Sequence, residues 1–317
     1  MSRFVLGVDE AGYGPNLGPL VIAATAWKVD SPASEEAFFD LLACVLCDDE
    51  STGYRGLKIG DSKQVYQSGK GLKDLERSVL TLLGGLGVHP SSLKDLLGCL
   101  GINVEGVCLE EPWFFEHDVP LPVATTREDL DQTLHSCLNF DVWQEIGLKG
   151  IRLQFVTPAL FNRHLKGDIN KAVILSTQSV QLVNQLLNTL DFEPTSTKIL
   201  MDRHGGRKTY ADLLTEEFGE FTFLLEESPK LSRYRLGQRE FEFHVQGERY
   251  LPVAVASMVA KYVRELSMLS FNRYWQSRLE GLKPTAGYPG DAKRYFEEIQ
   301  PIMRKQKVKK ELIWRER

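Results

Sequence analysis

The stretch FVLGVDEAGYGPNLGPLVIAATA, residues 4–26, holds two apolar runs separated by a turn rich in glycine and proline. The runs are dominated by Val, Ile, Leu and Ala and are too tightly punctuated for helices, so we expect strands at residues 3–9 and 17–29. Two adjacent acids, Asp9 and Glu10, stand at the end of the first run. A carboxylate at a buried strand end is costly unless it is paired or binds a cation. This placement therefore calls for a functional explanation.

The two acids also pose a geometric problem. Neighbouring residues of a regular strand point to opposite faces of the sheet. Asp9 and Glu10 can therefore reach one common site only if the strand ends or bends between them, and the glycine turn that follows makes this plausible.

Composition limits the class of protein. The chain has 317 residues, of which 43% are hydrophobic and 26% charged, as in globular proteins. A net charge of −5 gives no overall positive field, so a nucleic-acid surface would have to be a local basic patch. No run approaches the ~18 apolar residues of a membrane span. The odd count of five cysteines favours a reducing cytoplasm over a disulfide framework.

Strand-like and helix-like segments alternate along the chain, which predicts an α/β sheet. We expect further strands at residues 151–156, 198–201, 221–225 and 241–245, and helices at 35–47, 72–83, 170–190 and 254–269. Residues 85–150 are less regular, and we interpret them as an insertion or lid. The prediction is one domain over residues 1–303 with this insertion, then a tail at 304–317 with seven basic residues and two acids.

Two more acids follow predicted strands, Asp202 and Glu248. Carboxylates grouped in this way suit Mg²⁺ or Mn²⁺, which prefer oxygen ligands. Two such ions about 4 Å apart can activate a water and stabilise the leaving oxygen of a phosphodiester. Any one acid could equally be a turn residue, a helix cap or half of a surface ion pair. The pair beside the glycine turn fits these alternatives least well.

Other motifs are less specific. Gly12-Tyr13-Gly14 could bring backbone amides to a phosphate or sugar, or could simply connect two strands. It is not a dinucleotide fingerprint, because it leads into a strand and not a helix. The aromatic run at residues 113–115 could be a stacking platform, although core packing is the more common role of such a run.

Taken together, five segments resemble motifs of the type 2 ribonuclease H family (ribonuclease HII), in family order and over most of the chain. They are GVDEAGYGPNLGPLV (7–21), GDSK (60–63), MDRHGGRKTYADLL (201–214), GERYLPVAVASMVAKYVREL (247–266) and GYPGDAKRYFEEI (287–299). The wording of the first and last is closer to the archaeal and eukaryotic branch.

The resemblance implies a ribonuclease H-like mixed sheet flanked by helices and a site for Mg²⁺ or Mn²⁺. It also implies that the glycine turn brings amides to the ribose 2′-hydroxyl and that Tyr288 packs on the sugar. The metal-binding and catalytic acids would be Asp9, Glu10, Asp202 and Glu248. The substrate-binding residues would be Gly12, Tyr13, Gly14, Ser62, Lys63, Lys261, Arg264 and Tyr288.

Two departures from the family pattern bear on function. Tyr13 stands where the family has arginine, and Glu248 stands where it has aspartate. The resemblance implies a metal-dependent endonuclease that hydrolyses the RNA strand of RNA–DNA hybrids or cuts duplex DNA containing ribonucleotides. Two alternatives stay open. One is a nucleic-acid-binding protein with weakened turnover on the same fold, and the other is a related nuclease with a different nucleic-acid substrate.

Overall fold

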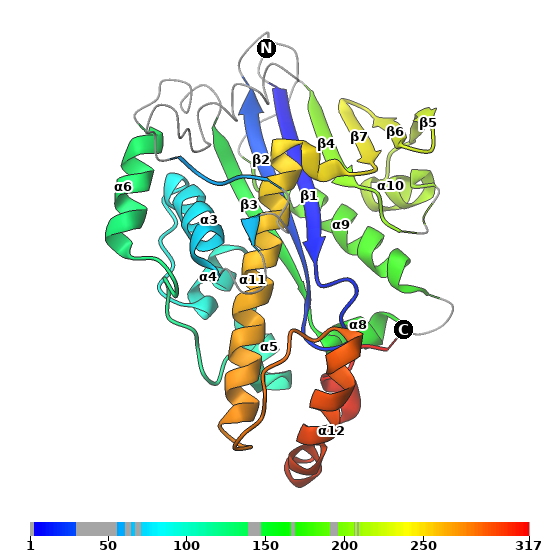
Figure 1. Cartoon of the computed structure of the whole chain (residues 1–317). Coiled ribbons are helices and arrows are strands. Elements are labelled where there is room, and N and C mark those ends of the chain that lie inside the picture. The colour runs from blue at the N-terminus through cyan, green and yellow to red at the C-terminus, as the bar shows by residue number, and fades with distance from the viewer. Residues whose placement is uncertain are drawn as a thin grey trace.

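The computed structural model describes most of the chain (Figure 1). The described residues are 3–29, 56–60, 65–66, 71–138, 147–165, 169–190, 196–205, 207 and 209–316. The predicted substrate-binding residues Ser62 and Lys63 and the predicted helix at residues 35–47 lie outside them. Among the helices that are described, none is long and apolar enough to cross a membrane.

The described residues form one seven-stranded mixed sheet in the order β3-β2-β1-β4-β7-β6-β5. The β1–β4 and β4–β7 pairs are parallel and the other pairs are antiparallel. This confirms the predicted mixed α/β sheet. The strands are β1 (Arg3–Ala11), β2 (Leu20–Val29), β3 (Leu148–Val156), β4 (Thr197–Asp202), β5 (Phe223–Glu227), β6 (Leu231–Leu236) and β7 (Arg239–His244).

Each face of the sheet is covered by its own set of helices. In β1, Val5 belongs to the core cluster under α11 (Leu251–Gln276), whereas Phe4, Leu6 and Val8 belong to the cluster under α9 (Lys171–Leu187) and α10 (Ala211–Phe218). Strand alternation thus divides one apolar run between two cores. Figure 1 shows α11 crossing the near face of the sheet.

The first turn of α11 lies directly against β1 at a glycine. A Cβ atom added to Gly7 would come within 2.1 Å of the carbonyl carbon of Pro252. The Thr25 hydroxyl on β2 donates a hydrogen bond of 2.9 Å to the Pro252 carbonyl oxygen. Only glycine at position 7 permits this approach, which fixes the start of α11 above the centre of the sheet.

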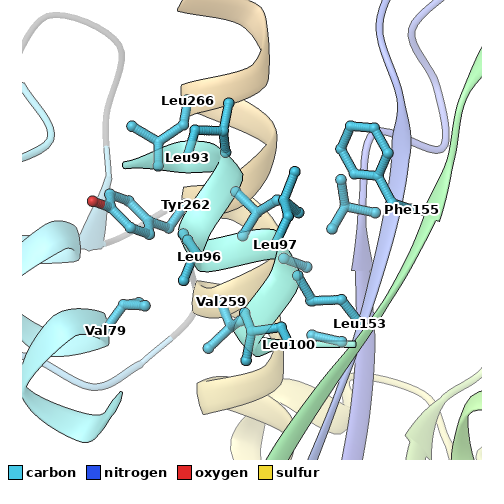
Figure 2. Packing of buried hydrophobic residues seen from close by; sticks show 14 of the residues in the cluster. Val79, Leu93, Leu96, Leu97, Leu100, Leu153, Phe155, Val259, Tyr262 and Leu266 are labelled. Carbon is cyan, nitrogen blue, oxygen red and sulfur yellow. The ribbon is translucent and has the colours of Figure 1, made fainter. Parts of the chain in front are cut away.

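Residues 85–150 contribute to the same core as α11. They contain α4 (Leu93–Cys99), α5 (Val104–Glu110), η1 (Pro112–Phe114) and α6 (Arg127–Leu138), after α3 (Lys73–Gly85). Figure 2 shows Leu97 of α4 facing Leu153 and Phe155 of β3, and Leu96 on the opposite side of α4, facing Val79 and Tyr262. The run Trp113-Phe114-Phe115 is at most 1% exposed, so it is core and not a stacking platform.

A buried carboxylate joins this segment to the sheet-covering helices. Glu76 of α3 is fully buried and accepts hydrogen bonds from the backbone N–H groups of Val123 and Thr125, both at 2.7 Å. The Tyr262 hydroxyl of α11 donates to the same carboxylate at 2.8 Å. Several donors to one carboxylate compensate for its burial.

Strand β6 was not predicted from the sequence. Its residues LSRYRL alternate buried and partly exposed positions, but three of the six are polar or charged and mask the strand pattern. The usable signal was the two-residue Gly237-Gln238 connection to β7, in which Gly237 has a positive φ of 52°. The predicted strand at 221–225 is shifted to β5.

The last residues of the chain fold back onto its beginning. Arg304 to Gln306 belong to α12 (Pro289–Gln306), and η3 (Lys310–Leu312) follows. Leu17 and Trp314 then form an antiparallel bridge, and Arg315 is only 2% exposed. Figure 1 shows the C-terminus beside α8 (Pro158–His164).

The close contact at Gly7 yields a test of the fold. Gly7→Ala should lower the free energy of unfolding by about 3 kcal/mol or more, because backbone atoms and not a flexible side chain must move. Gly98→Ala is the matched control, since no atom lies within 4 Å of its added Cβ. It should be neutral or stabilising by up to about 1 kcal/mol. Equal denaturant midpoints for the two variants would contradict the assigned contact.

Candidate functional site

A cleft of about 530 Å³ lies at the end of β1. Asp9 and Glu10 come from β1, Asp202 from the end of β4, and Glu248 from η2 (Gly247–Arg249). All four predicted acids therefore line one cleft, although they come from three segments far apart in the sequence. The other lining residues are Ala11, Gly12, Tyr13, Val245, Gln246, Lys261, Arg264 and Tyr288.

We expected β1 to end or bend between Asp9 and Glu10 so that both acids could reach one site, but the strand does not end there. It continues to Ala11, which still pairs with Val21 of β2. The ladder with β4, however, ends at Val8 opposite Met201. Beyond that point β1 keeps a neighbour on one side only. Both acids therefore line the cleft at the open side of the strand, even though β1 stays regular.

Asp202 and Glu248 are held by local hydrogen bonds. The Gly247 backbone N–H donates to Asp202 Oδ1 at 2.9 Å, which ties the end of β4 to the segment that carries Glu248. The Ser257 hydroxyl of α11 donates to Glu248 Oε1 at 2.9 Å. Ser257 was not predicted from the sequence. Its position two helical turns after the start of α11 is meaningful only once the helix is placed beside β1.

The carboxylates repel one another in this cleft. Burial, and then the neighbouring charge of Glu10, raise the pKa of Asp9 well above its usual value. Burial, and then the charge of Asp202, raise the pKa of Glu10 to about 7. Glu248 adds to both effects. A set of acids in this condition is stabilised by any cation that enters it.

The donor set fits a hard divalent cation. All four acids offer oxygen ligands, the type that Mg²⁺ and Mn²⁺ prefer. Within the part of the chain that the structure describes, no three Asp, Glu, His or Cys side chains are close enough to form a ready-made metal site. An ion would therefore have to draw the carboxylates inward or use bridging waters, which Mg²⁺ commonly retains.

The glycine turn is held tightly at its first glycine. Gly12 has a φ of +92°, and a Cβ there would come within 2.5 Å of Arg264 Nε and 2.6 Å of the Pro19 carbonyl oxygen. Gly14 has open space around it and does not line the cleft. Sequence alone treated the two glycines alike, and the structure separates them.

The segment around Tyr288 also lines the cleft and is hydrogen-bonded to the residues that follow the glycine turn. The Gly287 carbonyl accepts hydrogen bonds from the N–H groups of Asn16 at 2.9 Å and Leu17 at 3.2 Å. Tyr288 itself is 50% exposed, with the Arg264 guanidinium 5.7 Å from the centre of its ring. Its ring is therefore available to a ligand in the cleft.

The two predicted cations of α11 already have protein partners. The Lys261 ammonium donates to Glu265 at 2.7 Å and lies 4.9 Å from the centre of the Tyr66 ring. The Arg264 guanidinium is buried and donates to the Ala286 carbonyl at 2.8 Å. Each is held in a defined position at the edge of the cleft.

A further cation lies beside Tyr13 and was missed in the sequence. The Lys171 ammonium, from the first turn of α9, is 4.6 Å from the centre of the Tyr13 ring. A lysine over an aromatic face is attracted by the ring electrons. Where the resembling family has arginine in the turn, this chain therefore places a tyrosine with a lysine from another element on top of it.

Three solved structures similar to this chain are ribonucleases H2, HII and HIII. The ribonuclease H2 from Pyrococcus horikoshii OT3 has 17% identity and a TM-score of 0.49, with 98% of this chain and 92% of that one covered. Ribonuclease HII of Archaeoglobus fulgidus, solved in complex with PCNA, has 14% identity and a TM-score of 0.41, with 99% and 94% covered. Bst-RNase HIII with Mn²⁺ has 15% identity and a TM-score of 0.45, with 98% and 66% covered.

These overlaps are loose, with TM-scores of 0.41 to 0.49. No family model and no curated protein matches the chain. The roles of individual residues are therefore argued from the geometry of this chain alone.

The two glycines of the turn give a matched test. Gly12→Ala should destabilise the protein by about 2 kcal/mol or more, because a non-glycine residue is strained at this φ and its Cβ meets backbone. Gly14→Ala should change stability by less than about 0.5 kcal/mol. Thermal unfolding of both variants measures the difference. Similar melting temperatures would mean that the turn is not held at Gly12.

Proposed function

We propose that this protein is a metal-dependent endoribonuclease that hydrolyses the RNA strand of RNA–DNA hybrids or cuts duplex DNA at ribonucleotides. The observation that supports this most is the meeting of Asp9, Glu10, Asp202 and Glu248 in one cleft beside the glycine turn. Acids brought together from distant segments, at a cost in mutual repulsion, are expected at a site that binds cations and not at random surface positions.

In this proposal the four acids hold Mg²⁺ or Mn²⁺. The bound metal would supply an activated water and stabilise charge at the scissile phosphate. The residues of the chain have separate tasks. Gly247 N–H and Ser257 keep Asp202 and Glu248 oriented towards the cleft. Burial of Asp9 and Glu10 and the charges of the neighbouring acids raise the pKa values of both carboxyls, so the ionised forms would be stabilised strongly by a cation.

Substrate recognition is assigned to the rim of the cleft. The backbone of Gly12 and Tyr13 is close enough to the acids to contact the sugar next to the scissile phosphate, where a 2′-hydroxyl distinguishes RNA from DNA. The half-exposed ring of Tyr288 can pack against that sugar. Lys261 and Arg264 lie on the same rim and would attract the phosphate backbone.

A second candidate is a nucleic-acid-binding protein with weakened turnover. The spacing of the acids favours it, since no three metal-ligating side chains of the described residues are already grouped. The tie between Glu248 and Ser257 also resists inward movement. The two candidates differ in one observable, because the second binds ribonucleotide-containing duplexes in Mn²⁺ without cutting them.

The deciding experiment uses labelled duplexes with zero, one or several consecutive ribonucleotides, incubated with Mg²⁺ or Mn²⁺. The proposal expects cutting only where ribonucleotides are present and only with a divalent ion. Binding without cleavage would favour the second candidate. Cutting of all-DNA or structured RNA substrates would instead indicate a related nuclease with a different substrate.

Removing one carboxylate charge tests the metal assignment. Asp9→Asn and Asp202→Asn should each reduce kcat by about 100-fold or more, because each keeps the side-chain size and loses a metal-ligating charge. Both variants should stay folded. Glu216→Gln, an exposed acid of α10, is the control and should cleave normally. Wild-type cleavage rates in both asparagine variants would contradict the assignment of Asp9 and Asp202 as metal ligands.

Tyr13 should set the preference between substrates. The Lys171 ammonium lies over the Tyr13 ring, and Tyr13→Arg would add a further positive charge beside that lysine. The added guanidinium can form a forked contact with a phosphate, so we expect better cleavage at a single ribonucleotide relative to a longer RNA stretch. Tyr13→Phe keeps the ring and should leave this ratio unchanged. An unaltered ratio in Tyr13→Arg would show that residue 13 does not control the preference.

A further inference from the structure

The end of the chain reaches the glycine turn through Arg315. The backbone of this segment pairs with the residues after the turn: the Arg315 N–H donates to the Asn16 carbonyl at 2.8 Å, and Asn16 Nδ2 donates to the Arg315 carbonyl at 3.3 Å. On its other side, Asn162 of α8 donates to the Trp314 carbonyl at 2.8 Å. The segment is thus anchored between α8 and the turn.

The Arg315 side chain joins two backbone carbonyls of the turn. Its Nη2 group donates to the carbonyl oxygens of both Gly12 and Pro15. These two carbonyls bracket Tyr13 and Gly14. One guanidinium group therefore fixes the distance between these two carbonyls and so the path of the turn between them. Carbonyls held on the rear side also fix the direction of the peptide groups between them.

This position is expensive for a charged group. Arg315 is 2% exposed, and its Nε and Nη1 atoms are buried without a hydrogen-bond partner. Burial, and then the charge of Arg264, lower the pKa of Arg315 to about 9. No described carboxylate forms an ion pair with it. A well-packed apolar side chain commonly serves stability equally well at such a place, so the charge is expected to have a task beyond stability.

We propose that Arg315 is a positioning residue, which holds the Gly12–Pro15 turn in the conformation that receives the sugar-phosphate strand. The C-terminal segment is then part of the active site without touching the substrate. The inference deepens the proposed nuclease function and rests on it for its kinetic consequence. Its structural consequence, a turn that loosens without Arg315, does not depend on that function.

The experiment compares Arg315→Met and Arg315→Lys with wild type. Methionine approximates the stem and removes the charged fork, whereas lysine keeps a charge that can donate to both carbonyls but lacks the planar geometry. Arg163→Met is the matched control, since Arg163 is an exposed arginine of neighbouring α8 whose guanidinium pairs with Glu110. Each protein is followed by thermal unfolding, by hydrogen exchange and by cleavage of a duplex containing ribonucleotides.

In Arg315→Met we expect exchange in residues 12–17 to be about tenfold faster, with the sheet strands, β1 included, unchanged. We expect kcat to fall by about 10- to 100-fold, because a displaced turn misaligns the substrate, and KM to change little. Arg315→Lys should recover part of both effects, and Arg163→Met should behave as wild type.

Two results would overturn the inference. One is unchanged exchange in the turn of a folded Arg315→Met protein. The other is a uniform rise in exchange with a loss of activity that matches the unfolded fraction, which would make Arg315 merely structural. If Arg315→Met does not fold, Arg315→Lys decides by the same readouts. If the wild type cuts no duplex at all, the proposed function fails, and the exchange comparison still decides the role of Arg315.

Discussion

The contact between Gly7 of β1 and Pro252 of α11 is the constraint on which the site depends. It brings backbone to backbone, with the Thr25 hydroxyl fixing the same Pro252 carbonyl. Asp9 lies two residues beyond Gly7 on the same side of β1, and Glu248 lies just before α11, whose second residue is Pro252. The packing that orders the fold therefore also sets how far apart these two carboxylates are. A larger residue at position 7 would push α11 away and carry Glu248 with it.

The charged carboxylates of the cleft lower the free energy of unfolding to which this packing contributes. Repulsion and burial raise the pKa values of Asp9 and Glu10, so the ionised cleft costs free energy in the absence of a cation. Two apolar clusters, one on either side of the sheet, oppose this cost. The arrangement is one in which the core holds charges together that would otherwise separate. In the proposed function, a divalent ion would relieve this repulsion.

Much of the fold could be predicted from the sequence, because short, nearly continuous apolar runs bounded by turn or polar residues mark β1, β2 and β4 as buried strands. Strand β6 could not be predicted, since half of its residues are polar or charged and hide the alternation of buried and exposed positions. The acids of the site could be predicted because strand ends are recognisable. Ser257 and Lys171 could not, because a serine inside a helix and a lysine in a first turn acquire meaning only from what lies opposite them. Tertiary contacts carry that information, and local patterns do not.

The glycine turn shows how far this dependence extends. Its conformation is enforced from the Gly287 carbonyl, from Arg264 of α11 and from Arg315 at the end of the chain. Each of these reaches the turn from a different element, so no local fragment contains the interactions that shape it. In the folded chain the turn therefore has contacts from α11, from the segment before α12 and from the terminal segment. Because the same turn borders the four carboxylates, an incompletely folded chain would hold neither the acids nor the turn in the arrangement on which the proposed function depends.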